Sequence, residues 1–183
     1  MWLARARIAA RLVCVAALAA TTAGCFHPLY AEHTDGTPGL RDKLLAVEVP
    51  PVDKPNGSRE ARVGVAIRNA LAFKLYGNAT GMPPTHRLVL KFTTNRATLM
   101  TDPNTALPNS VDYGIDAQYT LIEIATNKAV LNGNTFARVS YDMPGSFQRF
   151  AAARAYDDAE DRAAQVIADN IQTRLASFFG TGS

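Results

Sequence analysis

Residues 87–96 alternate apolar and polar side chains, which is the pattern of a β-strand with one buried face and one wet face. Leu88, Leu90 and Phe92 take the buried positions of this predicted strand. The stretch that follows, residues 101–109, contains several proline and asparagine residues. This composition predicts a long loop.

A second alternating stretch runs from Val111 to Leu121, and its apolar positions shift by one residue after Leu121. Because side chains alternate strictly along a strand, such a shift indicates a β-bulge or a bend. Residues 129–141 alternate again, and only a tight connection at residues 126–128 separates the two stretches. We therefore expect them to pair as an antiparallel hairpin.

Two further stretches place apolar residues three and four positions apart, which is the spacing of an amphipathic helix. The first starts behind Ser58, whose hydroxyl can cap a helix, and ends at Gly77. Within it, Gly64 is expected to let a neighbouring element approach closely. The second is predicted to start near Tyr156. Its apolar side is expected to consist of Ala159, Ala163, Val166, Ile167, Ile171, Leu175 and Phe178.

The predicted start of the second helix is rich in acidic residues, namely Asp157, Asp158, Glu160 and Asp161. Carboxylates at a helix start are stabilised by the positive end of the helix dipole, and this is the interpretation that we favour. A metal site is the alternative. It is less favoured because no histidine lies nearby and because successive helical residues point in different directions.

An apolar run at residues 44–49, stopped by two prolines, predicts one more buried strand. Each predicted helix has one apolar stripe, and the predicted sheet has one apolar face. We therefore expect an α+β domain over residues 44–180, with two helices packed on one face of a four-stranded, mostly antiparallel sheet. The other face of the sheet would be open to solvent or to a partner.

The amino terminus has the organisation of a secretory signal peptide over residues 1–24. A short basic segment precedes an apolar run at residues 12–20, and small residues lead up to Cys25. The apolar run is about half of the ~20 residues that a membrane-spanning helix needs, so a retained transmembrane anchor is the weaker interpretation. Residues 25–43 contain several proline and glycine residues and are expected to form a flexible tether.

Cys25 is predicted to carry covalent lipid. The only other cysteine, Cys14, lies inside the predicted signal peptide, so Cys25 would have no partner for a disulfide in the mature chain. An unpaired thiol outside the cytoplasm invites cross-linking, and lipidation explains a lone cysteine better. The alternative is a free or disulfide-bonded cysteine in a secreted protein. Lipid would hold the domain at a membrane without a spanning helix.

The net charge changes once the signal peptide is set aside. The chain has a formal charge of +3 from 19 basic and 16 acidic residues, but three of the basic residues and none of the acidic ones lie in residues 1–24. The mature chain is therefore neutral by this count. A neutral chain has no general field to collect polyanions, so nucleic acid is not an expected partner.

No residues with a recognisable catalytic spacing are present. His27, His33 and His86 have no nucleophile or carboxylate at a persuasive distance in sequence, and Ser146 lacks the G-x-S-x-G frame of a nucleophile elbow. There is also no phosphate-binding glycine loop and no cysteine pair for zinc. We therefore expect neither an enzyme nor a cofactor other than the lipid on Cys25.

The sequence around Cys25 resembles the lipobox of bacterial lipoproteins, with Ala23 and Gly24 in front of the cysteine. Thr22 departs from it, because that position usually holds leucine or another larger apolar residue. The chain as a whole resembles the LPS-assembly lipoprotein family LptE. The resemblance rests on the Gly-Cys-Phe-x-Pro-Leu-Tyr start at residues 24–30, the hairpin from Tyr119 to Leu131 and the acidic start of the last helix.

The resemblance implies a diacylglyceryl thioether and an N-acyl chain, such as palmitate, on Cys25. It further implies an outer-membrane lipoprotein on the periplasmic side that partners an LptD-like β-barrel as plug and assembly factor. The family binds lipopolysaccharide on its way to the cell surface. Because lipopolysaccharide carries phosphates, local cations are its candidate contacts. They are Lys91, Arg96, Lys128 and Arg138.

Two other classes of protein share parts of this pattern. An auxiliary lipoprotein of a lipid-exporting ABC transporter would have the same anchor and a small α+β domain. A lipoprotein enzyme that acts on the cell wall would share the anchor but would need catalytic residues that are not apparent. Co-purification separates the first alternative, because the LptE family should bring down a large outer-membrane barrel and the transporter lipoprotein an inner-membrane complex.

Overall fold

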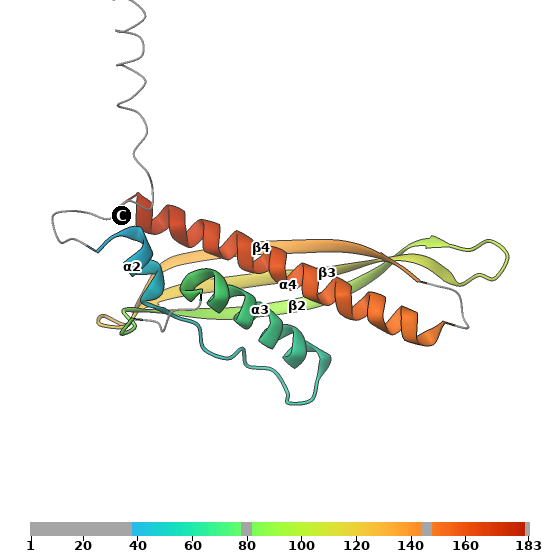
Figure 1. The fold of residues 1–183 in the computed structure, drawn as a ribbon, viewed down its shortest axis with the longest axis horizontal. Helices are drawn as coiled ribbons and strands as arrows, with labels where there is room; N and C mark the ends of the chain where they lie inside the picture. The colour runs from blue at the N-terminus through green and yellow to red at the C-terminus, as the bar shows by residue number, and fades with distance from the viewer. Residues whose placement is uncertain (1–37, 78–81, 144–147, 182–183) are drawn as a thin grey trace, which may run out of the picture. The chain divides into compact units, whose positions relative to one another are not determined.

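The computed structural model describes residues 38–77, 82–143 and 148–181. The chain divides into two units, residues 1–40 and 41–183, and the fold below is that of the second unit. Figure 1 shows its elements. In order they are α2 (Leu40–Leu45), β1 (Val47–Glu48), α3 (Arg59–Tyr76), β2 (His86–Thr101), β3 (Pro108–Glu123), β4 (Lys128–Asp142) and α4 (Arg149–Gly180).

The strands form one four-stranded sheet in the order β1-β2-β3-β4. β1 runs parallel to β2, and the other two pairs are antiparallel. The predicted α+β class with a mostly antiparallel sheet is therefore confirmed. The β3–β4 pairing shifts register between Leu121 and Ile122, which confirms the bulge that the change of alternation predicted.

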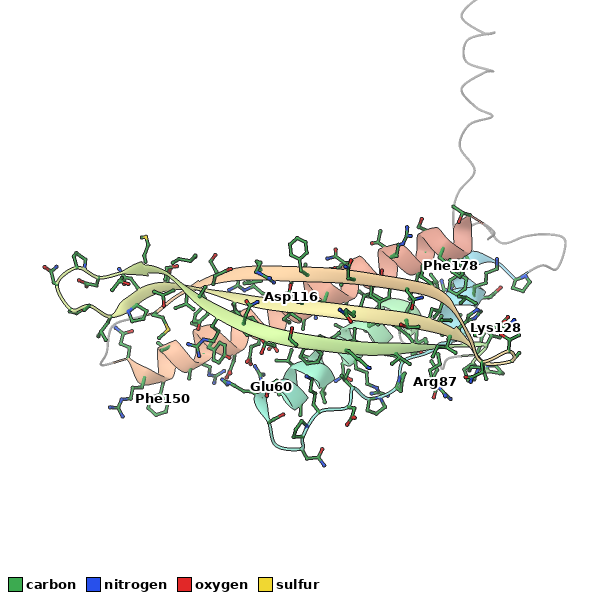
Figure 2. The ribbon with its side chains drawn as sticks, turned by 180° about the vertical axis from the view of Figure 1, so that it is seen from behind. Glu60, Arg87, Asp116, Lys128, Phe150 and Phe178 are labelled. Atoms are coloured by element: carbon green, nitrogen blue, oxygen red, sulfur yellow. The ribbon has the colours of Figure 1, made fainter. Side chains whose placement is uncertain are left out.

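One face of the sheet is the core face. Leu88, Leu90 and Phe92 of β2 are buried there, as are the alternate residues of β3 from Val111 to Leu121. The views from opposite sides in Figures 1 and 2 show α3 and α4 on the same face of the sheet. Among the residues that the structure describes, no helix lies on the opposite face, which is therefore open as the sequence predicted.

Helix α3 begins and ends where the sequence predicted. The Ser58 hydroxyl accepts a hydrogen bond of 3.0 Å from the backbone N–H of Ala61, and Gly77 ends the helix with a φ of 60°. A Cβ placed on Gly64 would lie 3.3 Å from Cβ of Val52. The glycine therefore allows the close approach that was expected, in this case by the segment between β1 and α3.

Helix α4 begins seven residues earlier than the sequence predicted, at Arg149 instead of near Tyr156. Its N-cap, Gln148, makes no capping hydrogen bond with its side chain, so no capping signal marks the start. The predicted apolar side also needs correction. Val166 is 40% exposed, and Phe179 is buried in place of Phe178, because the buried row follows four-residue steps along the helix.

The predicted strand at residues 44–49 is wrong for most of its length. Its first residues belong to helix α2, which was not predicted, and only Val47 and Glu48 pair with β2. A short apolar run cannot be assigned to helix or strand by periodicity alone. Beyond β1, the Lys54 ammonium donates a hydrogen bond of 2.9 Å to the carbonyl of Phe92, which covers part of the edge of β2.

Strands β2 and β3 extend further than predicted and form a hairpin that continues past the end of β4 (Figure 1). The last pairing of β3 with β4 joins Ser110 to Asp142. The loop predicted at residues 101–109 is reduced to residues 102–107. The backbone N–H of Asp102 closes it by a hydrogen bond of 2.9 Å to the carbonyl of Leu107.

Candidate functional site

The open face of the sheet carries a regular array of polar side chains. The strand register places Thr93, Asp116 and Phe136 side by side across β2, β3 and β4. The next row on the same face consists of Lys91, Gln118 and Asn134. Asp116 lies near the middle of this face in Figure 2.

Asp116 is held in place from both neighbouring strands. Arg138 of β4 donates two hydrogen bonds, of 2.9 and 3.0 Å, to the two carboxylate oxygens. The side-chain amide of Asn95 of β2 donates a third, of 3.1 Å. Gly114 makes this possible, since a Cβ at this residue would lie only 2.2 Å from Oδ1 of Asn95. The carboxylate is therefore fixed by charge-assisted hydrogen bonds before any ligand arrives.

A shallow hollow lies over these two rows, with a volume of about 510 Å³. The side chains that line it on the open face are Lys91, Thr93, Asp116, Gln118, Asn134 and Phe136. Phe136 is 66% exposed, which is unusual for a phenylalanine on a face whose exposed side chains are mostly polar. The hollow therefore presents charged groups, amides, a hydroxyl and one aromatic ring together on one face.

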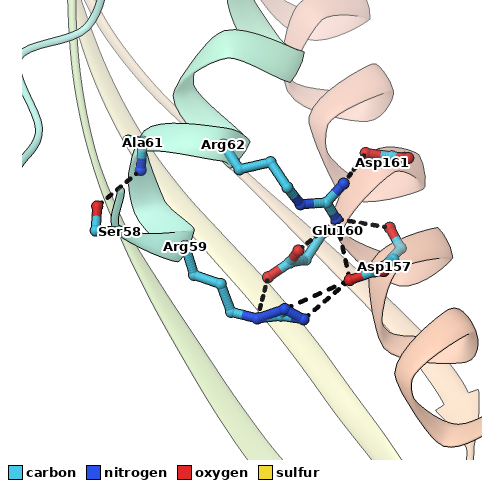
Figure 3. Close-up of polar contacts among 7 residues, drawn as sticks. All are labelled: Ser58, Arg59, Ala61, Arg62, Asp157, Glu160 and Asp161. Carbon is cyan, nitrogen blue, oxygen red and sulfur yellow. Dashed lines mark hydrogen bonds and ion pairs between the residues drawn. The ribbon is translucent and has the colours of Figure 1, made fainter. Parts of the chain in front are cut away.

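A second cluster of charged residues joins α3 to α4 (Figure 3). Glu160 is only 1% exposed, and its Oε2 lies 2.6 Å from Nη2 of Arg62. Nε of Arg59 lies 3.7 Å from the other carboxylate oxygen of Glu160, and Asp157 accepts from both arginines. The hydrogen bond to Glu160 raises the pKa of Arg62, with nearby Asp161 and Asp157 acting in the same direction.

This cluster corrects the interpretation of the acidic run. The carboxylates of residues 157–161 do not lie at the start of α4, and the first turn of that helix contains no acidic residue. Glu160 and Asp157 instead pair with arginines of α3, and Asp158 pairs with Arg162 one turn further along α4. In the part of the chain that the structure describes, no group of three or more metal-ligating residues is present.

Tyr113 and Tyr156 form an aromatic contact on the core side next to this cluster, with ring centroids 5.6 Å apart. Burial raises the pKa of Tyr113, and the charge of Glu160 raises it further. The guanidinium of Arg96 lies 4.5 Å from the ring centre of Tyr156 and covers it as a cation–π contact. Arg96 is therefore on the helix-covered side of β2.

The four predicted lipopolysaccharide contacts do not come together. Lys91 and Arg138 share the open face, but Arg138 is engaged by Asp116. Arg96 lies on the other face. Lys128 lies at the far end of β4, opposite Glu123 in the strand register. It is ten residues from Arg138, which is about 33 Å along an extended strand. The sequence placed Lys91, Arg96 and Arg138 on strands and Lys128 in the tight connection, where the structure makes it the first residue of β4, but it could not show that the four are dispersed.

His86 lies at the start of β2 and packs edge-to-face against Phe179, with ring centroids 5.2 Å apart. Burial lowers the pKa of His86. The other residues weighed at the sequence level, which are Cys25, His27, His33 and Ser146, lie outside the described residues. None of the described helices has the length and apolar character needed to span a membrane.

Sequence reasoning missed the roles of Asn95, Gly114 and Asp116. Their alternation placed Asn95 and Asp116 on the wet face, but their contact depends on which residues of β2, β3 and β4 face each other. An isolated glycine in a strand does signal a close approach by another group. Gly114 is the one signal that could have identified the site.

Comparison with solved structures identifies proteins that share this fold. The fold is shared with a candidate lipoprotein from Caulobacter crescentus CB15, at 23% identity and a TM-score of 0.61, over 79% of this chain and 97% of that one. It is also shared with the rare lipoprotein B of Shewanella oneidensis, at 15% identity and a TM-score of 0.50, over 72% of this chain and 94% of that one. Comparison with curated protein sequences gives no match.

The domain thus has an α+β fold that it shares with these two solved structures. The model of the lipopolysaccharide-assembly family LptE matches residues 44–175. Since this is more than half of the sequence, the chain belongs to that family, and the resemblance noted at the sequence level is confirmed.

Proposed function

We propose that this protein is an outer-membrane lipoprotein that partners an LptD-like β-barrel. In this role it acts as plug and assembly factor and helps to deliver lipopolysaccharide to the cell surface. The observation that carries the proposal is the family match over residues 44–175. The role is one of binding and assembly, not of catalysis.

The architecture supports this proposal in one further respect. The domain has a helix-covered face and an open face whose exposed side chains are mostly polar. The lumen of a wide outer-membrane barrel is also polar, so such a domain could sit in it without burying a large apolar surface. The proposed cargo contacts stay Lys91, Arg96, Lys128 and Arg138, each as a separate hypothesis because the four are dispersed.

We also propose that the chain is cleaved after residue 24 and lipidated on Cys25, so that it is anchored in the outer membrane and faces the periplasm. Each buried methylene of a lipid chain contributes about 0.8 kcal/mol, and more than one chain gives stable anchoring. The rest of the chain then needs no spanning helix.

Purification of the protein from membranes tests the anchor and the partner together. We expect the wild-type chain to sediment with outer membranes, to carry a mass shift on Cys25 and to bring down a large β-barrel protein. Cys25→Ser should move it to the soluble fraction, whereas Cys14→Ser should change nothing because residue 14 is removed. Recovery of an inner-membrane transporter complex would favour the alternative class, and an unmodified Cys25 in the wild type would contradict the anchor.

A further inference from the structure

We propose that the hollow on the open sheet face binds an oligosaccharide. The inference rests on the proposed function, because the sugar part of lipopolysaccharide is the carbohydrate that this protein would meet. It adds a site and a recognition chemistry for the sugars, separate from the acyl chains and phosphates of lipid A.

The polar side chains of the hollow have unused hydrogen-bonding capacity. Within the described part of the chain, no hydrogen bond or ion pair is made by the side chains of Lys91, Thr93, Gln118 and Asn134. In the adjacent row of the same face, by contrast, Thr120 donates to Asn132 at 2.9 Å. The hollow therefore offers an ammonium, a hydroxyl and two amides, a mixture of donors and acceptors that matches the hydroxyl groups around a sugar ring.

Phe136 supplies the second element of sugar recognition. Its ring is two-thirds exposed and lies beside Asp116 and next to the amide of Asn134. A sugar ring presents C–H groups on its faces and hydroxyls at its rim, so it can stack on an aromatic ring while its rim meets polar groups. Arg138 lies 5.7 Å from the ring centre and contributes a cation–π contact that helps to hold the ring.

The backbone beneath the hollow is held by strand pairing. The side chains of the hollow come from three paired strands, and Asp116 is fixed by Arg138 and Asn95. A site on strands loses little conformational freedom on binding, which favours weak polar ligands such as sugars. Its volume of about 510 Å³ lies within the range of small-ligand sites.

The composition argues against an acyl chain as the occupant of the hollow. Acyl chains need an apolar groove, whereas Phe136 is the one large apolar side chain on this face of the hollow. Lys91 instead favours a sugar that carries a carboxylate or a phosphate group.

The test uses the full-length lipidated protein in detergent and three probes: intact lipopolysaccharide, its polysaccharide released by mild acid, and lipid A. Binding is measured by isothermal titration calorimetry. We expect the polysaccharide to bind the wild type, and the pair Gln118→Ala with Asn134→Ala to weaken it about tenfold, since two hydrogen bonds are lost. Phe136→Ala should weaken it by a similar factor.

The matched control is the pair Thr120→Ala with Asn132→Ala, which removes one hydroxyl and one amide from the same face but outside the hollow. It should leave polysaccharide binding unchanged. Circular dichroism melts of both pairs exclude unfolding as the cause of any loss.

The outcomes separate this inference from the proposed function. If intact lipopolysaccharide binds but the polysaccharide does not, or if the variants of the hollow and the control lose equal affinity, the sugar site is overturned and the proposed function stands. If none of the three probes binds and no β-barrel co-purifies, both fail.

Discussion

Tyr113 carries a phenol that is buried between the sheet and α4, at 1% exposure. Burial raises its pKa, so the folded protein keeps this group protonated at pH values where the unfolded chain ionises it. A raised pKa of this kind contributes stability that is fully present below about pH 10, the ordinary tyrosine value, and is lost as the pH rises above it.

We therefore predict that Tyr113→Phe flattens the alkaline side of the stability profile. The wild type should lose more unfolding free energy between pH 9 and pH 11 than the variant, as measured by urea denaturation at each pH. Some loss should persist in the variant, because the pKa values of Tyr76, Tyr119 and Tyr156 are also raised. If the unfolding free energies of the two proteins fell in parallel between pH 9 and pH 11, Tyr113 would not control the alkaline loss of stability.

The residue scale also shows what the sequence could and could not predict. The cap at Ser58, the helix stop at Gly77 and the bulge after Leu121 were predictable, because each depends on its own residue and a few neighbours. The contact of Arg138 with Asp116 was not. It depends on strand register over 22 residues of sequence, which alternation alone leaves undetermined.

At the scale of elements, α3 and α4 are joined by a contact that periodicity cannot reveal. Both helices were predicted from their apolar stripes, yet Arg62 and Glu160 are 98 residues apart in sequence. The acidic run was assigned to the helix dipole because that explanation needs only local residues. With the helix starting at Arg149, the acids lie further along α4, where they face the arginines of α3.

This arrangement predicts unequal effects for two arginines that both form ion pairs. Arg62→Ala leaves the buried Glu160 with Arg59 as its one remaining ion-pair partner among the described residues, at 3.7 Å. We expect a loss of about 2 kcal/mol, less than the ~3–5 kcal/mol of a fully buried pair because Arg62 is partly exposed. Arg162→Ala breaks the exposed pair with Asp158 and should cost under about 0.5 kcal/mol. Urea denaturation at pH 7 measures both, and equal losses would contradict the role given to Glu160.

At the scale of the whole molecule, the buried core and the proposed signal peptide and lipidation site occupy different parts of the sequence. The described core belongs to elements that start at Leu40, whereas the predicted signal peptide and Cys25 precede residue 38. Among the described residues, hydrophobic burial, which dominates folding stability, is thus supplied by α2 and the later elements. Anchoring would be supplied by covalent lipid on Cys25, whose acyl chains would enter the bilayer.

This separation predicts that the domain folds without its amino-terminal segment. A chain that starts at residue 38 should keep the thermal midpoint of the lipidated protein, because α2 and every later element are retained. The same chain should stay in the soluble fraction, since it lacks Cys25. Circular dichroism melts and membrane sedimentation measure the two properties on the same samples. A lower midpoint in the shortened chain would mean that residues 1–37 contribute to the stability of the domain, and that folding and anchoring are coupled.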